Sequence, residues 1–328
     1  MKRFLIKLSF FSLSLIIPIL LVVLGELIIK NCEKFWKIPD DKDCIVLGHS
    51  HPECAFNDSL IQNLINLSLS GEAYLYTYTK LKKLIESNKQ LKTVFIEFGT
   101  NNFHESMDLW TWDNEHLNYN LPKYFAIIDK TEIRLLRNNN SKLFFSVTPR
   151  NYIKEIGYSY YNLLFNGNRV ISNKRRYGGY LYLIRNKIDS LVNIDQEIIT
   201  NKNSNDIPIK TSNTNILYLN KILELCKQNK ITAYLIRTPV HKMYSNQQEE
   251  EIYKCILNNE FSNSTFLDFK AFPLTDDEFG DFGHLNYKGA EIFSRWFSKL
   301  LSKGLLLTEE KQKFIDEEIL QFSMTRNE

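Results

Sequence analysis

The sequence has little cysteine, little net charge and no recognisable metal-binding motif. Five cysteines in 328 residues are too few and too scattered for a disulfide scaffold. No C-x-x-C pair or His/Cys cluster suggests a metal, so the sequence predicts no metal site. A net charge of +3 is too small to indicate nucleic-acid binding. With 44% hydrophobic residues, the chain instead has enough apolar material for a folded core.

Long apolar runs are also scarce, and the single one lies at the N-terminus. Leu8 to Gly25 contains no charged residue, and after Glu26 the apolar character continues to position 29. About 20 apolar residues cross a bilayer core as a helix. Residues 8–29 therefore predict one membrane-spanning helix, with no partner in the folded domain.

The flanks of this run indicate an uncleaved anchor. Lys2, Arg3 and Lys7 precede it, which favours a cytoplasmic N-terminus and an outward-facing domain. No A-x-A-like site follows it, so we favour an anchor over a removed signal peptide. Because the run is apolar on every face, a buried helix of a soluble protein is a poorer interpretation.

Beyond the anchor, strand-like and helix-like segments alternate with short connections. This rhythm predicts an α/β fold with a mostly parallel sheet. We expect a membrane anchor over 1–38, an α/β domain over 39–305 and a polar helical tail over 306–328. The strands are expected at 44–49, 65–69, 93–98, 231–237 and 264–268.

Residues 103–212 break this rhythm and are rich in Asn and aromatic residues. A connection this long is usually functional or a subdomain. Trp110 and Trp112 in it suit stacking on a sugar, and a small hydrophobic core is the alternative interpretation. Arg175 and Arg176 are expected either to contact an anionic polymer or lipid headgroup, or to be solvated.

The stretch "IVLGHSHPE" places Ser50 just after the first expected strand. Open α/β sheets bind their ligands at this edge, but a serine hydroxyl is a poor nucleophile without a base. "DFGHLN" supplies a candidate, because Asp281 can orient His284 while the ring takes the serine proton. In the other interpretation, Asp281 ends a turn and His284 caps a helix.

Other polar residues follow the expected strands. Gly71 can offer an unobstructed backbone N–H to a developing oxyanion, and Asn101 its side-chain amide, although both residues are also common in turns. His51 and Asn102 are weaker candidates for substrate contacts. His49 points to the face opposite its neighbours and is expected to pack or to support the site.

Together, "GHS", "SLSG", "GTN" and "DFGH" resemble, in order and relative spacing, the four blocks of the SGNH (GDSL-like) hydrolases. The resemblance covers residues 44–303, with the middle insertion unmatched. It implies a flavodoxin-like parallel sheet with Ser50 as nucleophile, Gly71 and Asn101 as oxyanion donors, and Asp281 with His284 as the remaining pair.

This sequence departs from the family pattern in two places. His49 stands where an aspartate usually precedes the serine, and Asn102 stands where the third block usually ends in aspartate. The anchor plus such a domain is also similar in architecture to envelope O-acyltransferase proteins.

The expected function is a membrane-anchored serine esterase or O-acyltransferase that acts on envelope or extracellular glycans. Such chemistry requires neither a metal nor another cofactor. A catalytically inactive scaffold or glycan-binding protein with the same fold is the alternative. The sequence names neither an acyl group nor a protein partner.

Overall fold

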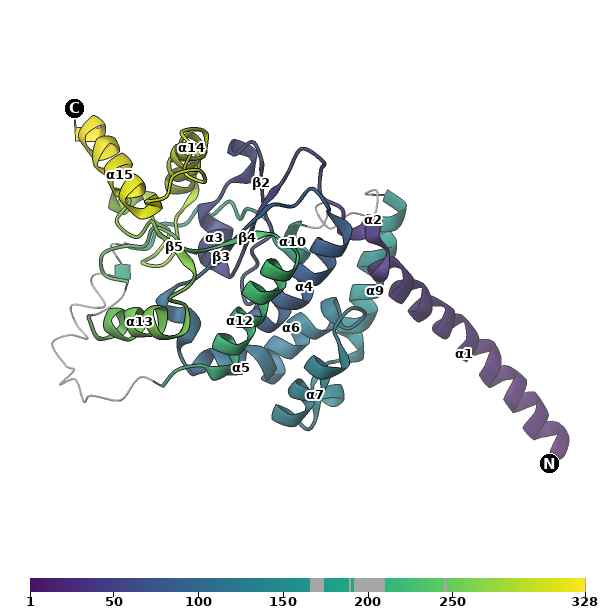
Figure 1. Ribbon diagram of the computed structural model, residues 1–328. Coiled ribbons are helices and arrows are strands. Elements are labelled where there is room, and N and C mark those ends of the chain that lie inside the picture. The colour runs from purple at the N-terminus through teal and green to yellow at the C-terminus, as the bar shows by residue number, and fades with distance from the viewer. Residues whose placement is uncertain (166–173, 189, 192–209, 245–246, 328) are drawn as a thin grey trace.

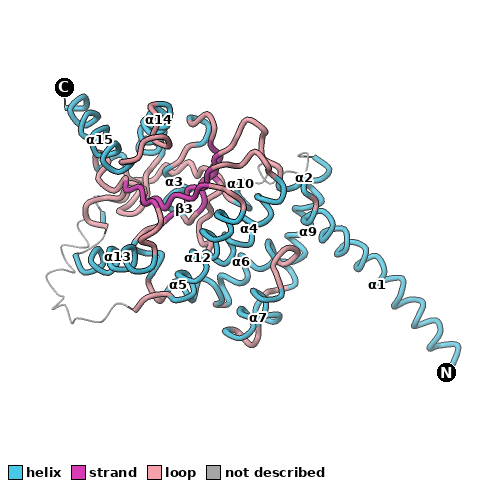
Figure 2. Tube along the Cα trace, viewed as in Figure 1, coloured by secondary structure: helices cyan, strands magenta, loops and turns pink. Residues whose placement is uncertain are grey.

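At the centre of the protein lies a parallel sheet of five strands. The computed structural model describes the chain except residues 166–173, 189, 192–209, 245–246 and 328. The sheet has the order β2-β1-β3-β4-β5 (Figure 2). Its strands are β1 (Cys44–Leu47), β2 (Leu64–Asn66), β3 (Thr93–Glu97), β4 (Thr232–Arg237) and β5 (Thr265–Asp268). The predicted parallel α/β sheet is confirmed, although each strand is slightly shorter than expected.

Helices cover both faces of this sheet (Figure 1). Successive strand residues point to opposite faces, so Ile45 and Leu47 join one core while Val46 joins the other. The first core is covered by α2 (Glu33–Trp36), α4 (Tyr74–Ser87), α12 (Asn213–Gln228) and α13 (Gln247–Glu260). The second is covered by α3 (Ser50–Ala55), α14 (Tyr287–Ser302) and α15 (Lys311–Asn327).

The strand order reverses between β1 and β3. The chain places β2 on one side of β1 and β3 on the other, and all neighbours pair in parallel. The carboxyl ends of β1 and β3 therefore flank a crevice, which is where open α/β sheets bind ligands. Ser50 follows β1, and a short 3-10 helix, Thr100–Phe103, follows β3.

The segment between β3 and β4 is mainly helical. It contains α5 (Ser106–Trp112), α6 (Asn114–Tyr124), α7 (Lys130–Asn139), α8 (Leu143–Ser146), α9 (Pro149–Phe165) and α10 (Lys174–Tyr177). Leu117, Leu121 and Leu136 of these helices are buried in the same core as Ile45. The described part of the insertion thus extends the main core. Residues 192–209 of it lie outside the described part.

The N-terminal helix α1 (Lys2–Asn31) projects from the body (Figure 1). Within the described chain it alone is long and apolar enough to span a membrane, and its apolar window is 11% buried. The expectation that it has no packed partner is wrong at its C-terminal end. There the Ser159 hydroxyl donates to Glu26 at 2.8 Å, and the Tyr160 hydroxyl donates to the Val22 carbonyl at 3.0 Å.

The C-terminal helix α15 packs on the sheet. Ile315 is fully buried in the second core, and the Asp268 N–H of β5 donates to Gln312 at 2.8 Å. Near the end of α15, Arg326 forms an ion pair with Glu278 at 2.5 Å. Glu278 ends a short 3-10 helix, Asp276–Glu278, that precedes the loop carrying Asp281 and His284. The expected polar tail is thus a helix docked beside that loop.

Candidate active site

Ser50 is presented by a sharp turn at the end of β1. Gly48 has φ +153°, and a Cβ there would lie 2.4 Å from the Cβ of Glu97 on β3. A side chain at position 48 would therefore collide with the neighbouring strand. After this turn the chain enters α3, with Ser50 as its first residue. The backbone N–H of Ser50 has no partner within that helix, because the first N–H groups of a helix never do.

The Asp281–His284 loop brings an imidazole to this serine. Nε2 of His284 lies 2.7 Å from Oγ of Ser50, and Nδ1 lies 2.7 Å from Oδ1 of Asp281. An ionised carboxylate can only accept, so it fixes the proton of the neutral ring on Nδ1. Nε2 is then left as the acceptor for the Ser50 hydroxyl. The structure thus brings the three residues together in the order that nucleophile activation requires.

Asp281 is held in its ionised form. Partial burial alone would raise its pKa, but the hydrogen bond and charge of His284 outweigh this effect. The Gly283 N–H, which donates at 3.0 Å, and the charge of Arg185 act in the same direction. As a result the pKa of Asp281 lies well below its usual range. Arg185 forms an ion pair with the second carboxylate oxygen, so both oxygens are engaged.

A second imidazole contacts the same serine. Nδ1 of His49 lies 3.0 Å from Oγ of Ser50, and burial lowers the pKa of His49 to about 4. A neutral His49 can donate Nδ1–H to Oγ while the Ser50 hydroxyl donates to His284. Its Nε2 is buried with no hydrogen-bond partner among the described residues, and its ring lies 4.7 Å from that of Trp110. This contact was not predicted from the sequence.

His51 lies against His284. Its ring meets that of His284 edge to face at 5.0 Å, and its Nε2 lies 3.2 Å from the Tyr244 hydroxyl. Its Nδ1 lies 3.2 Å from a carboxylate oxygen of Glu97, without the alignment of a hydrogen bond. Burial would raise the pKa of Glu97, but His51 and His49 hold it below its ordinary value. His51 thus lies between this carboxylate and His284.

Gly71 is fixed beside the serine by polar contacts. Its φ of +75° is a conformation that other residues rarely adopt. Before it, the Ser70 N–H donates to Glu53 of α3 at 2.9 Å; after it, Asn120 donates to the Gly71 carbonyl at 2.8 Å. The Leu69–Ser70 and Gly71–Glu72 peptides, which flank the peptide carrying the Gly71 N–H, are therefore held. Gly71 and Ser50 line the same cavity, as an oxyanion donor would require.

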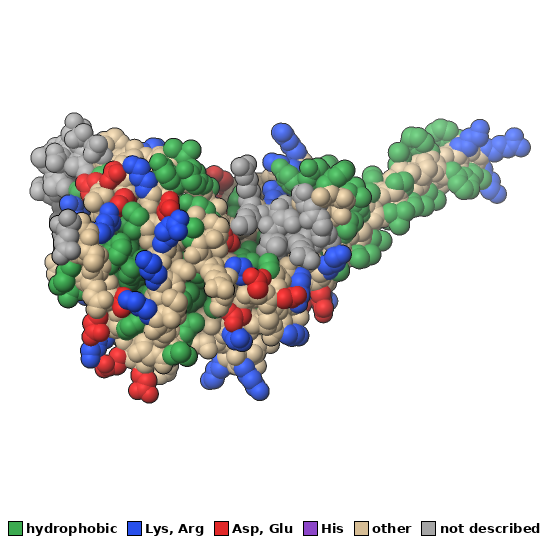
Figure 3. Space-filling view, turned by 90° about the horizontal axis from the view of Figure 1, so that it is seen from above, with side chains coloured by type: hydrophobic (Ala, Val, Ile, Leu, Met, Phe, Trp, Pro, Cys, Tyr) green, Lys and Arg blue, Asp and Glu red, His purple; other side chains and the backbone are tan. Residues whose placement is uncertain are grey.

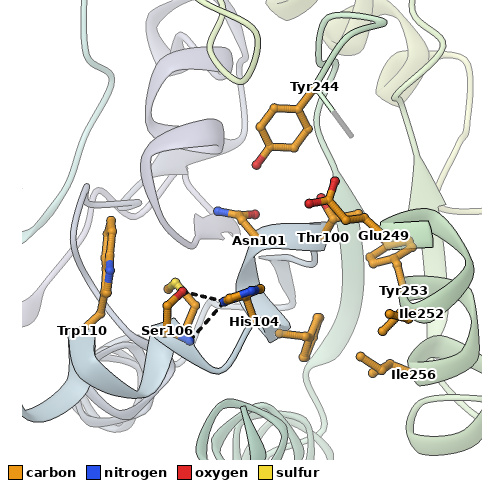
Figure 4. Close-up of a pocket in the computed structure, with 12 residues that line it drawn as sticks. Thr100, Asn101, His104, Ser106, Trp110, Tyr244, Glu249, Ile252, Tyr253 and Ile256 are labelled. Carbon is orange, nitrogen blue, oxygen red and sulfur yellow. Dashed lines mark hydrogen bonds between the residues drawn. The ribbon is translucent and has the colours of Figure 1, made fainter. Parts of the chain in front are cut away.

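Asn101 lies in a neighbouring cavity of about 370 Å³ (Figure 4). Its amide nitrogen is turned to the side on which Trp110 lies, while its oxygen is buried without a hydrogen-bond partner among the described residues. Trp110 lines this cavity and the Ser50 cavity. Asn102 is buried and accepts the Gly99 N–H at 2.7 Å, which places it as a support of the loop.

The Ser50 cavity has a volume of about 510 Å³. This size suits a small-molecule substrate or part of a polymer. Its walls combine the aromatic rings of Trp110 and Tyr119 with Leu181, Leu183 and Arg185. Trp112 is not part of this lining: it packs partly buried against the first core.

A strap of chain without helix or strand, residues 178–187, crosses the site. The Leu181 N–H donates to the Glu53 carbonyl of α3 at 2.9 Å. Further along, the Leu183 carbonyl accepts the Tyr287 N–H at 2.8 Å, and the Lys187 N–H donates to the Gly280 carbonyl at 3.0 Å. The strap is therefore bonded both to the helix that carries Ser50 and to the segment around His284. No local pattern in the sequence indicated this role.

The segment just before the strap is committed to internal contacts. Arg176 of α10 forms an ion pair with the buried Glu155 of α9. Its guanidinium is therefore engaged inside the protein, whereas the expected contact with an anionic polymer would need it to be free. The side chain of Arg175 lies outside the described part of the structure.

Comparison with known proteins adds one finding. The model of an uncharacterised family matches residues 159–306. This range includes the strap, Asp281 and His284, but it does not include Ser50. No curated protein matches the chain.

Proposed function

We propose that this protein is a membrane-anchored serine acyl hydrolase or O-acyltransferase of the SGNH type, acting on ester bonds of envelope or extracellular glycans. The observation that carries the proposal is the continuous set of contacts from Asp281 through His284 to Ser50, each 2.7 Å long. The strand order gives further support, because 2-1-3-4-5 is the flavodoxin-like order that the SGNH resemblance implies.

In the first half of the reaction, His284 takes the proton of Ser50 through Nε2 as Oγ attacks the ester carbonyl. The charge on the carbonyl oxygen is met by the backbone N–H groups of Ser50 and Gly71 and by the Asn101 amide. Asn101 lines the neighbouring cavity, on the other side of Trp110, so its side chain must move toward Ser50 to reach this oxygen. The charged His284 then gives its proton to the leaving alkoxide, and the acyl group stays on Ser50.

In the second half, His284 takes a proton from the acceptor hydroxyl. The acceptor is water in a hydrolase and a sugar hydroxyl in a transferase. It attacks the acyl carbonyl, the bond to Oγ breaks, and His284 returns its proton to Ser50. Both outcomes use the same residues, so the nature of the acceptor depends on what the cavity admits.

The cavity and the anchor support the proposed substrate class. Trp110 and Tyr119 bring aromatic rings to the cavity wall, which can contact a sugar beside the His116 and Lys123 side chains that already lie against them, and Arg185 adds positive charge at the same wall. The basic residues before the apolar run favour an outward-facing domain, where esterified glycans of the envelope would be in reach.

Labelling with a fluorophosphonate tests the nucleophile directly. In membranes containing the full-length protein, such a probe should modify Ser50, because the hydroxyl is activated by His284. The Ser50→Ala protein should remain unlabelled, and mass spectrometry should place the adduct on the peptide that contains Ser50. An unlabelled wild-type protein would favour the inactive scaffold or glycan-binding protein instead.

The role of His49 can be separated from its packing on Trp110. In His49→Phe the ring remains but the nitrogen facing Ser50 is lost, so we expect labelling about 5- to 10-fold slower, the effect of one hydrogen bond. In His49→Asn the amide nitrogen can take the place of Nδ1, and labelling should stay near the wild-type rate. A His49→Phe protein that labels at the wild-type rate, beside a slow His49→Asn protein, would show that the ring, and not its nitrogen, matters.

A further inference from the structure

Helix α9 buries polar side chains and exposes apolar ones, which is the opposite of what is expected for a helix at a water-exposed surface. Its buried residues, Glu155, Ser159 and Asn162, are all polar. Its exposed residues include Ile153, Tyr161, Leu164 and Phe165, with Leu164 71% and Phe165 70% exposed. A helix that faces water has its apolar stripe turned inward. The pattern of α9 suits a helix whose outer face meets lipid.

The neighbouring end of α1 has the same inverted pattern. Glu26 and Lys30 are buried, whereas Ile28 is 71% exposed. Lys30 contacts Glu155 at 2.5 Å and Glu26 at 3.3 Å, so these three charges are paired between the two helices. Burial alone would raise the pKa of Glu155, but Lys30 and Arg176 hold it below its ordinary value. The two helices thus shield their charges from any surrounding lipid.

The contacts also fix how the two helices run. Glu155 meets Lys30, Ser159 meets Glu26, and Tyr160 reaches Val22. Higher residue numbers on α9 therefore lie beside lower numbers on α1, so the helices are antiparallel. Beyond Glu155, α9 continues without a charged residue to Phe165. Its C-terminal turn consequently extends along the apolar run of α1.

This arrangement indicates where along α1 and α9 the boundary between lipid and water would lie. The uncharged run Leu8–Gly25 is about 27 Å long as a helix, close to the thickness of a bilayer core. Its outer end lies next to Ser159 and Tyr160. Tyrosines gather at the boundary between lipid and water, and α9 has Tyr158, Tyr160 and Tyr161 at that level. In Figure 3 hydrophobic side chains run along much of the projecting helix, and a group of them lies where the helix joins the body.

We propose that the C-terminal turns of α9 insert into the outer leaflet of the bilayer alongside α1. The partner of this surface is the lipid itself, and the protein thus has a second membrane contact besides its anchor. The inference rests on α1 spanning the bilayer and does not depend on the chemistry of Ser50. It also fixes the orientation of the domain, because two antiparallel helices joined by buried ion pairs restrict its tilt.

Spin labels can measure the depth of α9 in the full-length protein. The exposed Cys32 and Cys255 are replaced by serine, and single cysteines are introduced at Leu164, Tyr161 and Ile153. The labelled protein is placed in vesicles of phosphatidylethanolamine and phosphatidylglycerol. Collisions with oxygen, which concentrates in lipid, are compared with collisions with a water-soluble nickel complex. Leu15, in the middle of α1, and Leu320, on the exposed side of α15, are the lipid and water controls.

We expect Leu164 to favour oxygen over nickel several-fold, Tyr161 to be intermediate, and Ile153 to resemble Leu320. Ile153 and Leu164 lie about 16 Å apart along the helix, enough to separate lipid from water. A nickel-accessible label at position 164 would overturn the proposal. Exclusion of both reagents would also overturn it, because it would indicate a protein contact. If the label at Leu15 were as accessible to nickel as the label at Leu320, α1 would not span the bilayer, and the proposal would be overturned with it. The proposed chemistry at Ser50 would not be affected.

Discussion

Turnover of an acylated substrate should fall by on the order of 10⁵–10⁶ when Ser50 is replaced by alanine, and by about as much in His284→Ala. Neither group works alone, since Oγ depends on Nε2 of His284 at 2.7 Å for removal of its proton. The double variant should therefore be no slower than either single one. Release of acid from an acetylated glycan or a p-nitrophenyl ester measures all three.

Asp281→Asn belongs to the same experiment. The amide can present its NH₂ to Nδ1 of His284 and so favour the wrong tautomer, which costs about 10⁴ in a related arrangement. Ser302→Ala, on the exposed side of α14, is the matched control and should keep full turnover. A Ser50→Ala protein with wild-type turnover would show that another group is the nucleophile. A strictly specific transferase would need a polymer acceptor and an acyl donor in the assay.

Lys80→Met should destabilise the protein by about 3–5 kcal/mol, because it leaves a buried carboxylate without its counter-charge. Nζ of Lys80 is fully buried, 2.7 Å from Glu72, and also donates to the carbonyls of Leu67 and Tyr177. Burial lowers the pKa of Lys80, which the charge of Glu72 opposes. Urea unfolding in detergent, followed by pulse proteolysis, gives the free energy of unfolding.

A neighbouring ion pair on the same helix gives the control for this change. Lys83 contacts Glu86 at 2.8 Å, but the Glu86 side chain is 57% exposed, so Lys83→Met should cost less than 1 kcal/mol. Adding Glu72→Leu to Lys80→Met should recover part of the loss, since no unpaired charge then remains. If Lys80→Met and Lys83→Met had equal effects, the buried pair would not be a determinant of stability.

The sequence predicted the features that depend on local patterns. Alternating apolar segments indicated the five strands within a few residues, because buried parallel strands are short, β-branched and ended by glycine or polar residues. The order of the blocks around Ser50, Gly71, Asn101 and His284 then placed these residues after strands of one sheet. In a parallel sheet the strand ends share an edge, which brings Ser50 and Gly71 to one cavity and Asn101 to the neighbouring one.

What could not be predicted depends on pairing between distant segments. The contact of His49 with Ser50 arises because Gly48 turns the chain, which no alternation rule describes. The bond from Leu181 to Glu53 joins residues more than a hundred positions apart and uses backbone atoms, so it leaves no mark in composition. The hydrogen bond between Ser159 and Glu26 could not be predicted, because an isolated polar residue in an apolar run has many possible partners.

The strap over the site has two roles that use different atoms: it holds the Ser50 helix near the His284 segment, and it forms part of the cavity wall. At Leu181 and Leu183 it joins the Ser50 helix to the start of α14 through main-chain atoms, which are the same for every residue except proline. Arg185 adds a side-chain ion pair with Asp281. The side chains of Leu181 and Leu183 meanwhile form part of the cavity wall. Under the proposed function, substitutions of Leu181 or Leu183 should therefore alter which acyl group is accepted while the spacing of Ser50 and His284 stays the same. A protein with such a strap would be able to change its substrate through single mutations of these side chains, while its main chain keeps Ser50 and His284 in place.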